Sequence, residues 1–320
     1  MAKSVDWDRH IGRHLKLRDL HVFFTVVQAG SMAKAATHLR VTQPAVSQVI
    51  SDLEHALGVK LLDRNPRGVE PTVYGRSLLK GGAAAFDDLK QTIKEIEFLS
   101  DSATGEVRIG CPETVAAILP PVIENLYRRH PGIVLHVSEV VAPTLDLPPI
   151  RNRALDVAIV RIVESSSRHR LADDLDVEVL FTDENVVVAD ARSHWARRRK
   201  IDLAELVNEH WIVPGAATTS GIVFAEAFRL RGLSPPKVSL VTFSVALRTN
   251  MLASGRHLTV FPRSMVHLYA DRMSVKILPL RLPTVPAWPT VLVTLKNRMP
   301  NPAVKIFIDQ VRTEFKKFDT

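Results

Sequence analysis

The feature that most narrows the folds open to this chain lies near its N-terminus, where two predicted helices are joined by a very short turn. The first covers Met32 to Leu39, and its alanines are small enough to let a neighbouring helix pack closely. The second begins after Thr42, which can cap it, and Pro44 is tolerated in its first turn. Together with an amphipathic helix predicted from Leu17 to Ala29, these two helices predict a helix-turn-helix domain.

The second of these helices has an apolar stripe and an uncharged polar face. Val46, Ile50 and Leu53 recur at helical spacing and should be buried, which leaves Gln43 and Gln48 on the other side. A solvated helix usually carries Lys and Glu there, whereas a Gln amide can both donate to and accept from an adenine in the DNA major groove. The alternative for this helix taken alone is an ordinary amphipathic helix.

A basic hairpin is predicted after the three helices. Val59 to Leu62 and Val69 to Val73 are typical of two short strands, and the turn between them carries Arg64 and Arg67. Such a basic tip can contact phosphates or a minor groove. Residues 1–80 hold 12 Lys and Arg against 7 Asp and Glu, so they contribute +5 of the formal net charge of +8. This asymmetry indicates a domain that faces phosphates.

The run from Leu17 to Thr72 resembles the winged helix-turn-helix of LysR-type transcriptional regulators. The motifs that carry the resemblance are Ala29-Gly-Ser-Met-Ala-Lys-Ala-Ala36, Thr42-Gln-Pro-Ala-Val-Ser47, Leu53-Glu54, Leu57-Gly58-Val59 and Leu61-Leu-Asp-Arg64. By position, the resemblance implies DNA contacts from Ser31, Lys34, Thr42, Gln43, Pro44, Ser47, Gln48, Arg64, Arg67 and Thr72. Many members of the family carry Arg at the position of Gln48, so Gln48 departs from the pattern and favours adenine or a phosphate over guanine.

A long helix is predicted from about Tyr74 to Leu99. Its apolar residues alternate spacings of three and four, as in one strand of a coiled coil. The seam consists of Leu79, Gly82, Phe86, Leu89, Ile93 and Ile96. Packing against its own chain is one option, but a helix of this length between two domains favours dimerisation. The resemblance implies that this linker helix pairs two chains over an imperfectly palindromic site.

Beyond a polar hinge, the chain repeats one plan of strand, loop, helix and strand. The first copy has its elements at Glu106–Gly110, Val115–His130 and Ile133–Val137, and the second at Trp211–Val213, Gly221–Leu230 and Val238–Val241. The repeated order predicts two similar α/β subdomains rather than one large sheet. The family resemblance implies that this region resembles periplasmic binding proteins.

The predicted fold class is therefore α/β with an N-terminal winged helix-turn-helix. The domains are expected to be an N-terminal tail (1–16), a DNA-binding domain (17–73), a linker dimerisation helix (74–100), a hinge (101–105) and an effector-binding domain (106–320). Within the last, subdomain 1 is predicted to cover 106–182 and 276–320, and subdomain 2 to cover 183–275.

Loops that follow strands in such subdomains open onto helix N-termini, which favour a carboxylate or another anion. Thr114 lies in one such loop and Thr218 in the other, although each hydroxyl could simply cap its own helix. The resemblance implies an inducer in the cleft, and the candidate effector-binding residues are Cys111, Glu113, Thr114, Ala142, Pro143, Thr218, Thr219, Ser220 and Phe261. Arg256 and His257 could clamp an anionic effector or could be exposed loop residues.

The composition of the chain argues against several other classes of protein. The first residues have no apolar signal core and no apolar run reaches membrane-spanning length, so we expect a cytoplasmic protein without membrane contact. The single cysteine, Cys111, excludes an intramolecular disulfide and a cysteine-based zinc cluster. No metal-ligand spacing or phosphate loop is present, so no metal and no cofactor are expected.

The expected function is sequence-specific DNA binding controlled by a small-molecule effector. The expected partners are double-stranded promoter DNA, a small-molecule effector for which an anion is one option, further copies of this chain in a dimer or tetramer, and RNA polymerase if the protein activates transcription. Three rivals remain: an enzyme with Cys111 as nucleophile, which lacks a local base; a solute-binding protein; and an effector-independent DNA-binding protein. The basic run Arg197 to Lys200 is interpreted as a solvated turn.

Overall fold

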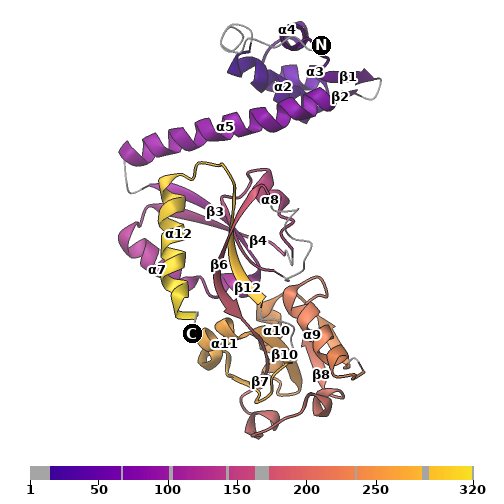
Figure 1. Ribbon diagram of the computed structural model, residues 1–320, viewed down its shortest axis with the longest axis vertical. Coiled ribbons are helices and arrows are strands. Elements are labelled where there is room, and N and C mark those ends of the chain that lie inside the picture. The colour runs from indigo at the N-terminus through magenta and orange to yellow at the C-terminus, as the bar shows by residue number, and fades with distance from the viewer. Residues whose placement is uncertain are drawn as a thin grey trace. The chain divides into compact units, whose positions relative to one another are not determined.

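The computed structural model describes residues 15–65, 68–100, 104–141, 144–162, 173–234, 236–282 and 288–318 (Figure 1). The chain forms two compact units, residues 1–90 and 91–320. Within the described residues, no helix is both long enough and apolar enough to cross a membrane.

The first unit is a three-helix domain with a small hairpin. Its elements are α2 (Leu17–Ala29), α3 (Met32–Leu39), α4 (Gln43–Leu57), β1 (Leu62–Asn65) and β2 (Gly68–Pro71). The bounds of α2 and α3 are those predicted, whereas β1 begins three residues later than the strand expected from Val59, and β2 runs from Gly68 to Pro71 rather than from Val69 to Val73. Phe23, Ile50 and Leu53 lie in the shared core of the helices, which confirms the predicted apolar stripe of α4.

Turns between these elements depend on left-handed backbone. Gly30 ends α2 at φ 63°, and Arg40 takes the same region at φ 56° to end α3. The Gly30 carbonyl oxygen accepts a hydrogen bond from Val69 N at 3.0 Å, so the hairpin is attached to the end of α2. A side chain at Gly68 would collide with that carbonyl, since its Cβ would lie 2.6 Å from the oxygen.

Glu54 joins α4 to the hairpin. Its side chain is buried, and Oε1 accepts from Leu61 N (2.9 Å) and Leu62 N (3.2 Å) while Oε2 pairs with Lys60 Nζ (2.7 Å). Burial by itself would raise the pKa of this carboxyl, but the lysine and the two backbone N–H groups lower it below its ordinary value. The ionised carboxylate therefore holds the strand leading into β1 against α4.

Helix α5 (Val73–Ser100) continues from the hairpin through the boundary of the two units. Its first half packs on the first unit, where the ring of Phe86 meets Phe24 edge to face at 5.6 Å. Leu79 also packs partly on this core. Leu89, Ile93 and Ile96 are 44%, 55% and 57% exposed. The predicted seam is thus divided: its first members contact their own unit, and its last three lie open.

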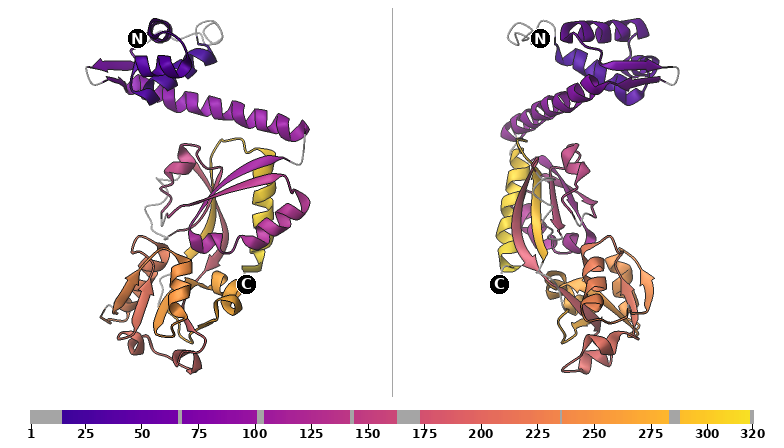
Figure 2. Two further views of the ribbon diagram at one scale, coloured as in Figure 1. Left: turned by 180° about the vertical axis from the view of Figure 1, so that it is seen from behind. Right: turned by 45° about the vertical axis from the view of Figure 1, so that its right-hand side comes forward.

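The second unit contains two sheets (Figure 2). The first has the strand order β4-β3-β5-β12-β6, in which β3, β4 and β5 are parallel and β12 is antiparallel to both of its neighbours. Its strands are β3 (Gly105–Cys111), β4 (Ile133–Glu139), β5 (Val157–Arg161), β6 (Leu175–Asp183) and β12 (Trp288–Leu295), and its helices are α6 (Glu113–Ala116), α7 (Pro120–Arg129), α8 (Pro148–Arg151), α12 (Pro302–Phe315) and η4 (Lys316–Phe318). Helices α7 and α12 lie side by side against one face.

The second sheet has the order β11-β7-β10-β8-β9, with β8, β9 and β10 parallel. Its strands are β7 (Asn185–Asp190), β8 (His210–Val213), β9 (Val238–Val241), β10 (His257–Pro262) and β11 (Val275–Ile277), and its helices are α9 (Thr219–Leu230), α10 (Val245–Leu252), α11 (Arg263–Met273), η2 (Trp195–Arg197) and η3 (Leu203–Leu206). One apolar cluster runs from Val107 and Ile109 of the first sheet to Val188 and Phe261 of the second, so the subdomains share a core.

Two sequence predictions require correction. The helix expected from Val115 to His130 is two helices, α6 and α7, because Pro120 and Pro121 lack the N–H groups that a continuous helix would need. The return to subdomain 1 comes later than residue 276, because β11 pairs with β7 of the second sheet and Leu278 and Leu282 belong to the core of that subdomain.

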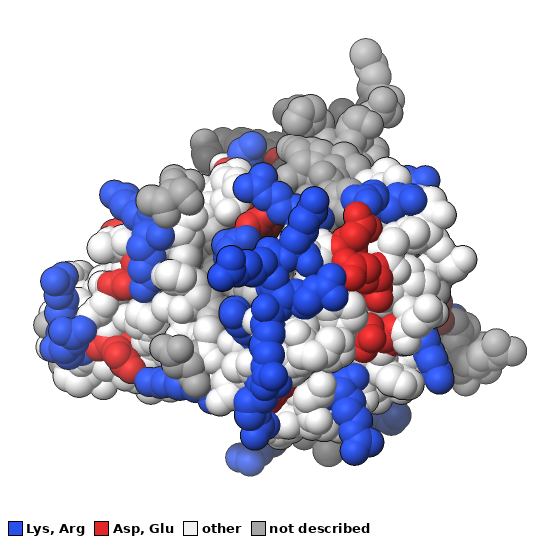
Figure 3. Space-filling view, turned by 90° about the horizontal axis from the view of Figure 1, so that it is seen from below, with Lys and Arg blue, Asp and Glu red and all other residues white. Residues whose placement is uncertain are grey.

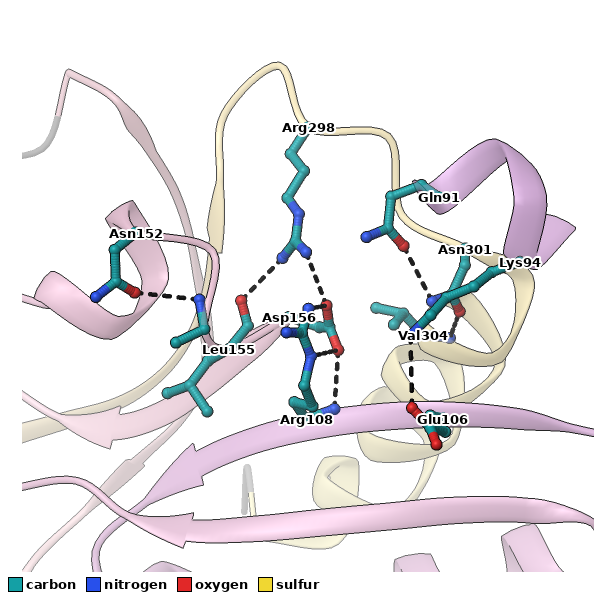
Figure 4. A network of polar contacts seen from close by, with 11 residues as sticks. Gln91, Lys94, Glu106, Arg108, Asn152, Leu155, Asp156, Arg298, Asn301 and Val304 are labelled. Carbon is teal, nitrogen blue, oxygen red and sulfur yellow. Dashed lines mark hydrogen bonds and ion pairs between the residues drawn. The ribbon is translucent and has the colours of Figure 1, made fainter. Parts of the chain in front are cut away.

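A polar network around Asp156 joins β3, the start of β5 and the segment after β12 (Figure 4). Asp156, which precedes β5, accepts from the backbone N (2.9 Å) and Nη2 (2.8 Å) of Arg108 on β3 and pairs with Arg298 after β12 (3.0 Å). Nearby, buried Asn301 caps α12 and donates to Oε1 of Gln91 on α5 at 3.2 Å. The end of α5 is therefore attached to the first subdomain through its side opposite Ile93.

We predict that Glu54→Ala exposes the hairpin to solvent exchange. Two buried N–H groups lose their acceptor, which costs about 2 to 4 kcal/mol of local stability. Hydrogen exchange of the Leu61 and Leu62 amides should accelerate, while the exposed control Glu70→Ala leaves it unchanged. Because the folded pKa is lowered, the wild-type protection should persist above the ordinary pKa of 4.5 and be lost as pH falls below it. Equal protection in both variants would contradict this role.

Candidate DNA-binding face and ligand cleft

The N-terminal half of α4 presents the polar face that the sequence predicts. Thr42 Oγ1 accepts from Ala45 N at 3.4 Å, so it caps the helix as expected. Gln43 and Pro44 are exposed and Ser47 is half-buried, on the side away from the core. These residues remain accessible among the described residues of the first unit, and the face has the width of one helix, which suits a major groove.

Gln48 is exposed but already has one partner. Its Nε2 donates to Asp52 Oδ1, one helical turn later, at 2.8 Å. This contact leaves the amide oxygen to face outward as an acceptor, which could receive an amino hydrogen from adenine or cytosine. The contact with Asp52 was not anticipated from the sequence, although the i, i+4 spacing is visible there.

The remaining predicted DNA contacts divide into three groups. Lys34 and Arg64 are exposed, and Ser31 is half-buried at the start of α3 without the side-chain capping bond expected of it. Thr72 has a structural role, because its hydroxyl donates to Lys60 O at 2.7 Å and accepts from Gly75 N at 3.1 Å. Arg67 lies outside the described residues.

A cleft lies between the two sheets of the second unit. It opens where α6 follows β3 and where α9 follows β8, as the parallel-strand argument predicts. Of the predicted effector residues, Glu113, Thr114, Thr218, Thr219 and Ser220 line it. The structure adds lining residues that the sequence did not single out: Pro112, Glu139, Val141, Arg161, Pro214, Phe243 and Arg248.

The three hydroxyls of the cleft at the start of α9 donate hydrogen bonds to the protein itself. Thr218 Oγ1 donates to Gly215 O and caps α9, which is the simple capping role weighed above. Thr219 Oγ1 donates to Arg161 O at 2.9 Å, and Ser220 Oγ donates to Asn185 Oδ1 at 2.7 Å. These hydroxyls position the start of α9 and can offer a ligand only an acceptor.

Arg161 crosses the cleft from the end of β5. Its guanidinium is 5% exposed, with Nη1 donating to Thr114 Oγ1 (2.9 Å) and Nη2 to Asp183 Oδ2 (3.0 Å) and Ser264 Oγ (3.3 Å). Burial lowers the pKa of this group and Asp183 opposes the shift. Nε has no partner among the described residues.

Arg248 and Glu113 form the opposite side. Arg248 of α10 is buried, its Nη1 donates to Val260 O at 3.0 Å, and its guanidinium carbon lies 4.3 Å from the centroid of Phe261. Glu113 Oε2 accepts from Val245 N at 2.7 Å, at the start of α10. The carboxylate of Glu113 therefore caps the N-terminus of α10.

Several candidates do not reach the cleft. Cys111 is 1% exposed, and burial raises the pKa of its thiol to about 12, so the thiol stays protonated and cannot serve as a nucleophile. Phe261 is fully buried beneath Arg248 rather than lining the surface. Ala142 and Pro143 lie outside the described residues. The described part of the chain has no group of three or more acidic, His or Cys side chains that could hold a metal.

Arg256 and His257 are also remote from the cleft. They precede and begin β10, and the cleft opens at the carboxyl ends of the parallel strands, the other edge of the sheet.

Lys and Arg side chains gather on the face seen from below in Figure 3. Arg197 to Lys200 are exposed, which agrees with their interpretation as a solvated turn.

The sequence held signals for both missed arginines. Arg161 ends the apolar run Val157 to Val160, where a charge at the carboxyl end of a buried strand is unusual. Arg248 shares a helical face with Val245 and Leu252, so an amphipathic reading would have placed its charge inward. Neither feature of the sequence predicts which cavity the side chain lines.

Comparison with known proteins agrees with this architecture. Residues 17–76 match the family described as "Bacterial regulatory helix-turn-helix protein, lysR family", and residues 100–316 match the "LysR substrate binding domain". The chain is 29% identical to the HTH-type transcriptional regulator GbpR of Azospirillum brasilense, covering 83% of this chain and 77% of that protein. It is also 29% identical to the regulator TdcA of Escherichia coli K12, covering 82% of each.

Solved structures share the fold at lower identity. A full-length OxyR variant from Pseudomonas aeruginosa has a TM-score of 0.59 at 23% identity, covering 94% of this chain and 95% of that one. Full-length CbnR in complex with its target DNA has a TM-score of 0.57 at 18% identity, covering 94% and 100%. Since the two family models match most of its length, the chain belongs to the LysR family of transcriptional regulators.

Proposed function

We propose that this LysR-family regulator binds a specific promoter sequence through α4 and responds to a small molecule bound in the cleft between its two sheets. The observation that carries the proposal is the presence, in one chain, of an uncharged, exposed amide face on α4 and a separate cleft lined by buried arginines. The amide face of α4 suits contacts with base edges, and the cleft suits a metabolite.

DNA recognition divides between two surfaces. Gln43 and Gln48 are proposed to contact base edges, since their amides can discriminate between bases. Lys34 and Arg64 are proposed to contact phosphates, which positions the helix without reading sequence. The target-DNA complex of CbnR supports DNA binding by a protein of this fold.

Dimerisation is proposed to occur through the open part of the α5 seam. Leu89, Ile93 and Ile96 are exposed in the isolated chain, whereas Gln91 on the other side of the helix is buried against Asn301. A second α5 would cover the apolar side and place two α4 helices on a two-fold symmetric site. A tetramer, and contact with RNA polymerase in an activator, are extensions of this arrangement.

Effector control is proposed to work by linkage. A ligand that binds one arrangement of the oligomer more tightly shifts the population toward it, and α5 carries the change to the spacing of the α4 helices. The rival is a DNA-binding protein with no effector. The arginine-lined cleft favours control, because two arginines with unpartnered buried Nε groups are costly to keep in a purely architectural domain.

The direct test measures binding to the DNA upstream of the protein's own gene and to random DNA of equal length, over a salt series. Preference that survives rising salt would support sequence-specific regulation, because charge-driven binding weakens steeply with salt. Equal affinity for both fragments at every salt concentration would contradict a specific site in that DNA.

We predict different outcomes for Gln43→Ala and Arg64→Ala. Losing a base contact should weaken specific binding by about 1 to 3 kcal/mol and relax base preference, with little effect on random DNA. Losing a phosphate contact should weaken both kinds of binding and flatten the salt dependence. Fluorescence anisotropy on both DNAs measures this, and equal losses of Gln43→Ala on specific and random DNA would remove its assigned role.

We predict that Ile93→Asp dissociates the oligomer. A carboxylate in an apolar helix seam must be desolvated, so association should weaken by more than about tenfold. Sedimentation velocity over a concentration series measures the shift. The matched control is Leu230→Asp, which places the same charge at an exposed leucine of α9 and should leave the assembly intact. An unchanged assembly in Ile93→Asp would refute the proposed seam.

A further inference from the structure

Arg248 is a buried cation with no salt bridge among the described residues, and Glu113 of the same cleft acts on its charge only from a longer distance. It is 1% exposed, and no carboxylate oxygen among the described residues lies within 4.0 Å of its guanidinium. One nitrogen donates to Val260 O, the Phe261 ring lies beneath the group, and Nε donates to nothing in the described chain. By contrast, Arg161 pairs directly with Asp183.

The burial of Arg248 without a salt bridge lowers the stability of the ligand-free protein. Removing an arginine from water without a salt bridge is costly, and burial accordingly lowers the pKa of Arg248 to about 10, a shift that the charge of Glu113 opposes. The group nevertheless remains charged at neutral pH. Because it lines the cleft, an anion entering there would supply the missing counter-ion.

The charges around the cleft limit what that anion can be. Two arginines line it, Arg161 and Arg248, together with two carboxylates, Glu113 and Glu139. Asp183 already neutralises one arginine. With Asp183 counted, three carboxylates already accompany the two arginines, so every negative charge on a ligand meets repulsion. A ligand with one negative charge can pair with Arg248 and meets less of this repulsion than a dianion does.

The rest of the lining is apolar. Pro112, Val141, Pro214 and Phe243 border the same space, and Phe243 remains 48% exposed there. Such surfaces contact hydrocarbon and exclude water from the ion pair, which strengthens it. A carboxylate attached to a small hydrocarbon body matches both parts of the lining better than a free inorganic ion does.

We infer that the effector is a small organic acid whose single carboxylate is bound by Arg248, with the guanidinium edge of Arg161 as the second anion-facing group. This inference rests on the proposed function, since it assigns a chemical class to the ligand of the same cleft. Phosphate esters share the oxyanion chemistry, and the charge balance ranks them below carboxylic acids.

The test uses the full chain and three matched probes: butyrate, its neutral isostere butyramide, and butyl phosphate. Thermal unfolding of the second unit is followed over a millimolar series of each probe at constant ionic strength. Butyrate should raise the unfolding midpoint, butyl phosphate should raise it less, and butyramide should leave it unchanged. A larger effect of butyl phosphate would overturn the preference for a carboxylate.

Arg248→Met supplies the decisive variant, since its unbranched side chain fills similar space without charge. We expect it to weaken butyrate binding about tenfold or more, while the ligand-free midpoint stays equal or rises because an unpaired buried charge has been removed. Arg248→Lys keeps the charge and should retain part of the response. The control Arg129→Met removes an exposed arginine of α7 and should respond like the wild type.

Outcomes separate the inference from the proposed function. A butyrate response that survives in Arg248→Met, or an equal response to butyramide, overturns the assignment of a carboxylate while a ligand-binding cleft remains. No response to any probe overturns the inference as well, and operator binding, measured on the same samples, then tests the regulatory role separately. If Arg248→Met does not fold, Arg248→Lys and the three probes still decide the question.

Discussion

The geometry of the cleft depends on Arg161. Its guanidinium contacts Thr114 and Asp183 on the side of the first sheet and Ser264 of α11 on the side of the second, while its carbonyl oxygen accepts from Thr219 at the start of α9. A single residue thus connects the segments that border the cleft on both sides. Because its charge is buried and paired, displacing it would leave the buried carboxylate of Asp183 without a cation, so the two subdomains meet in a defined way.

The second arginine of the cleft is held differently. Arg248 has a carbonyl and an aromatic ring for neighbours, and no carboxylate of the described residues forms a salt bridge with it. Arg161 therefore serves the structure and Arg248 is available to a ligand. In a family built to respond to small molecules, this division allows a cleft to hold its shape when empty and still offer an unsatisfied charge to whatever enters.

The DNA-binding unit depends on a comparable buried charge. Glu54 links α4 to the strand leading into β1, so the helix that presents Gln43 and the hairpin that presents Arg64 share one polar connection. Helix α5 then runs without interruption into the second unit, where Gln91 is bonded to Asn301 at the start of α12. A change in the subdomain that contains α12 can therefore reach the linker helix through a named contact.

The sequence by itself determined the local structure and the family. Helices α2 and α3, the cap at Thr42 and the stripe of α4 follow from helical periodicity and turn residues, which are local properties of the chain. It also placed the loops that open onto the cleft, because the ends of parallel strands share an edge of a sheet.

Only the tertiary structure decided which polar groups remain available. The hydroxyls of Thr218, Thr219 and Ser220 carry the right chemistry for a ligand, yet folding gives them partners within the protein. Arg248 attracted no notice in the sequence, yet packing brings it to the cleft without a salt bridge among the described residues. Hydrogen-bond partners come from segments distant along the chain, so periodicity and spacing cannot show which donors the fold satisfies and which it leaves for a ligand.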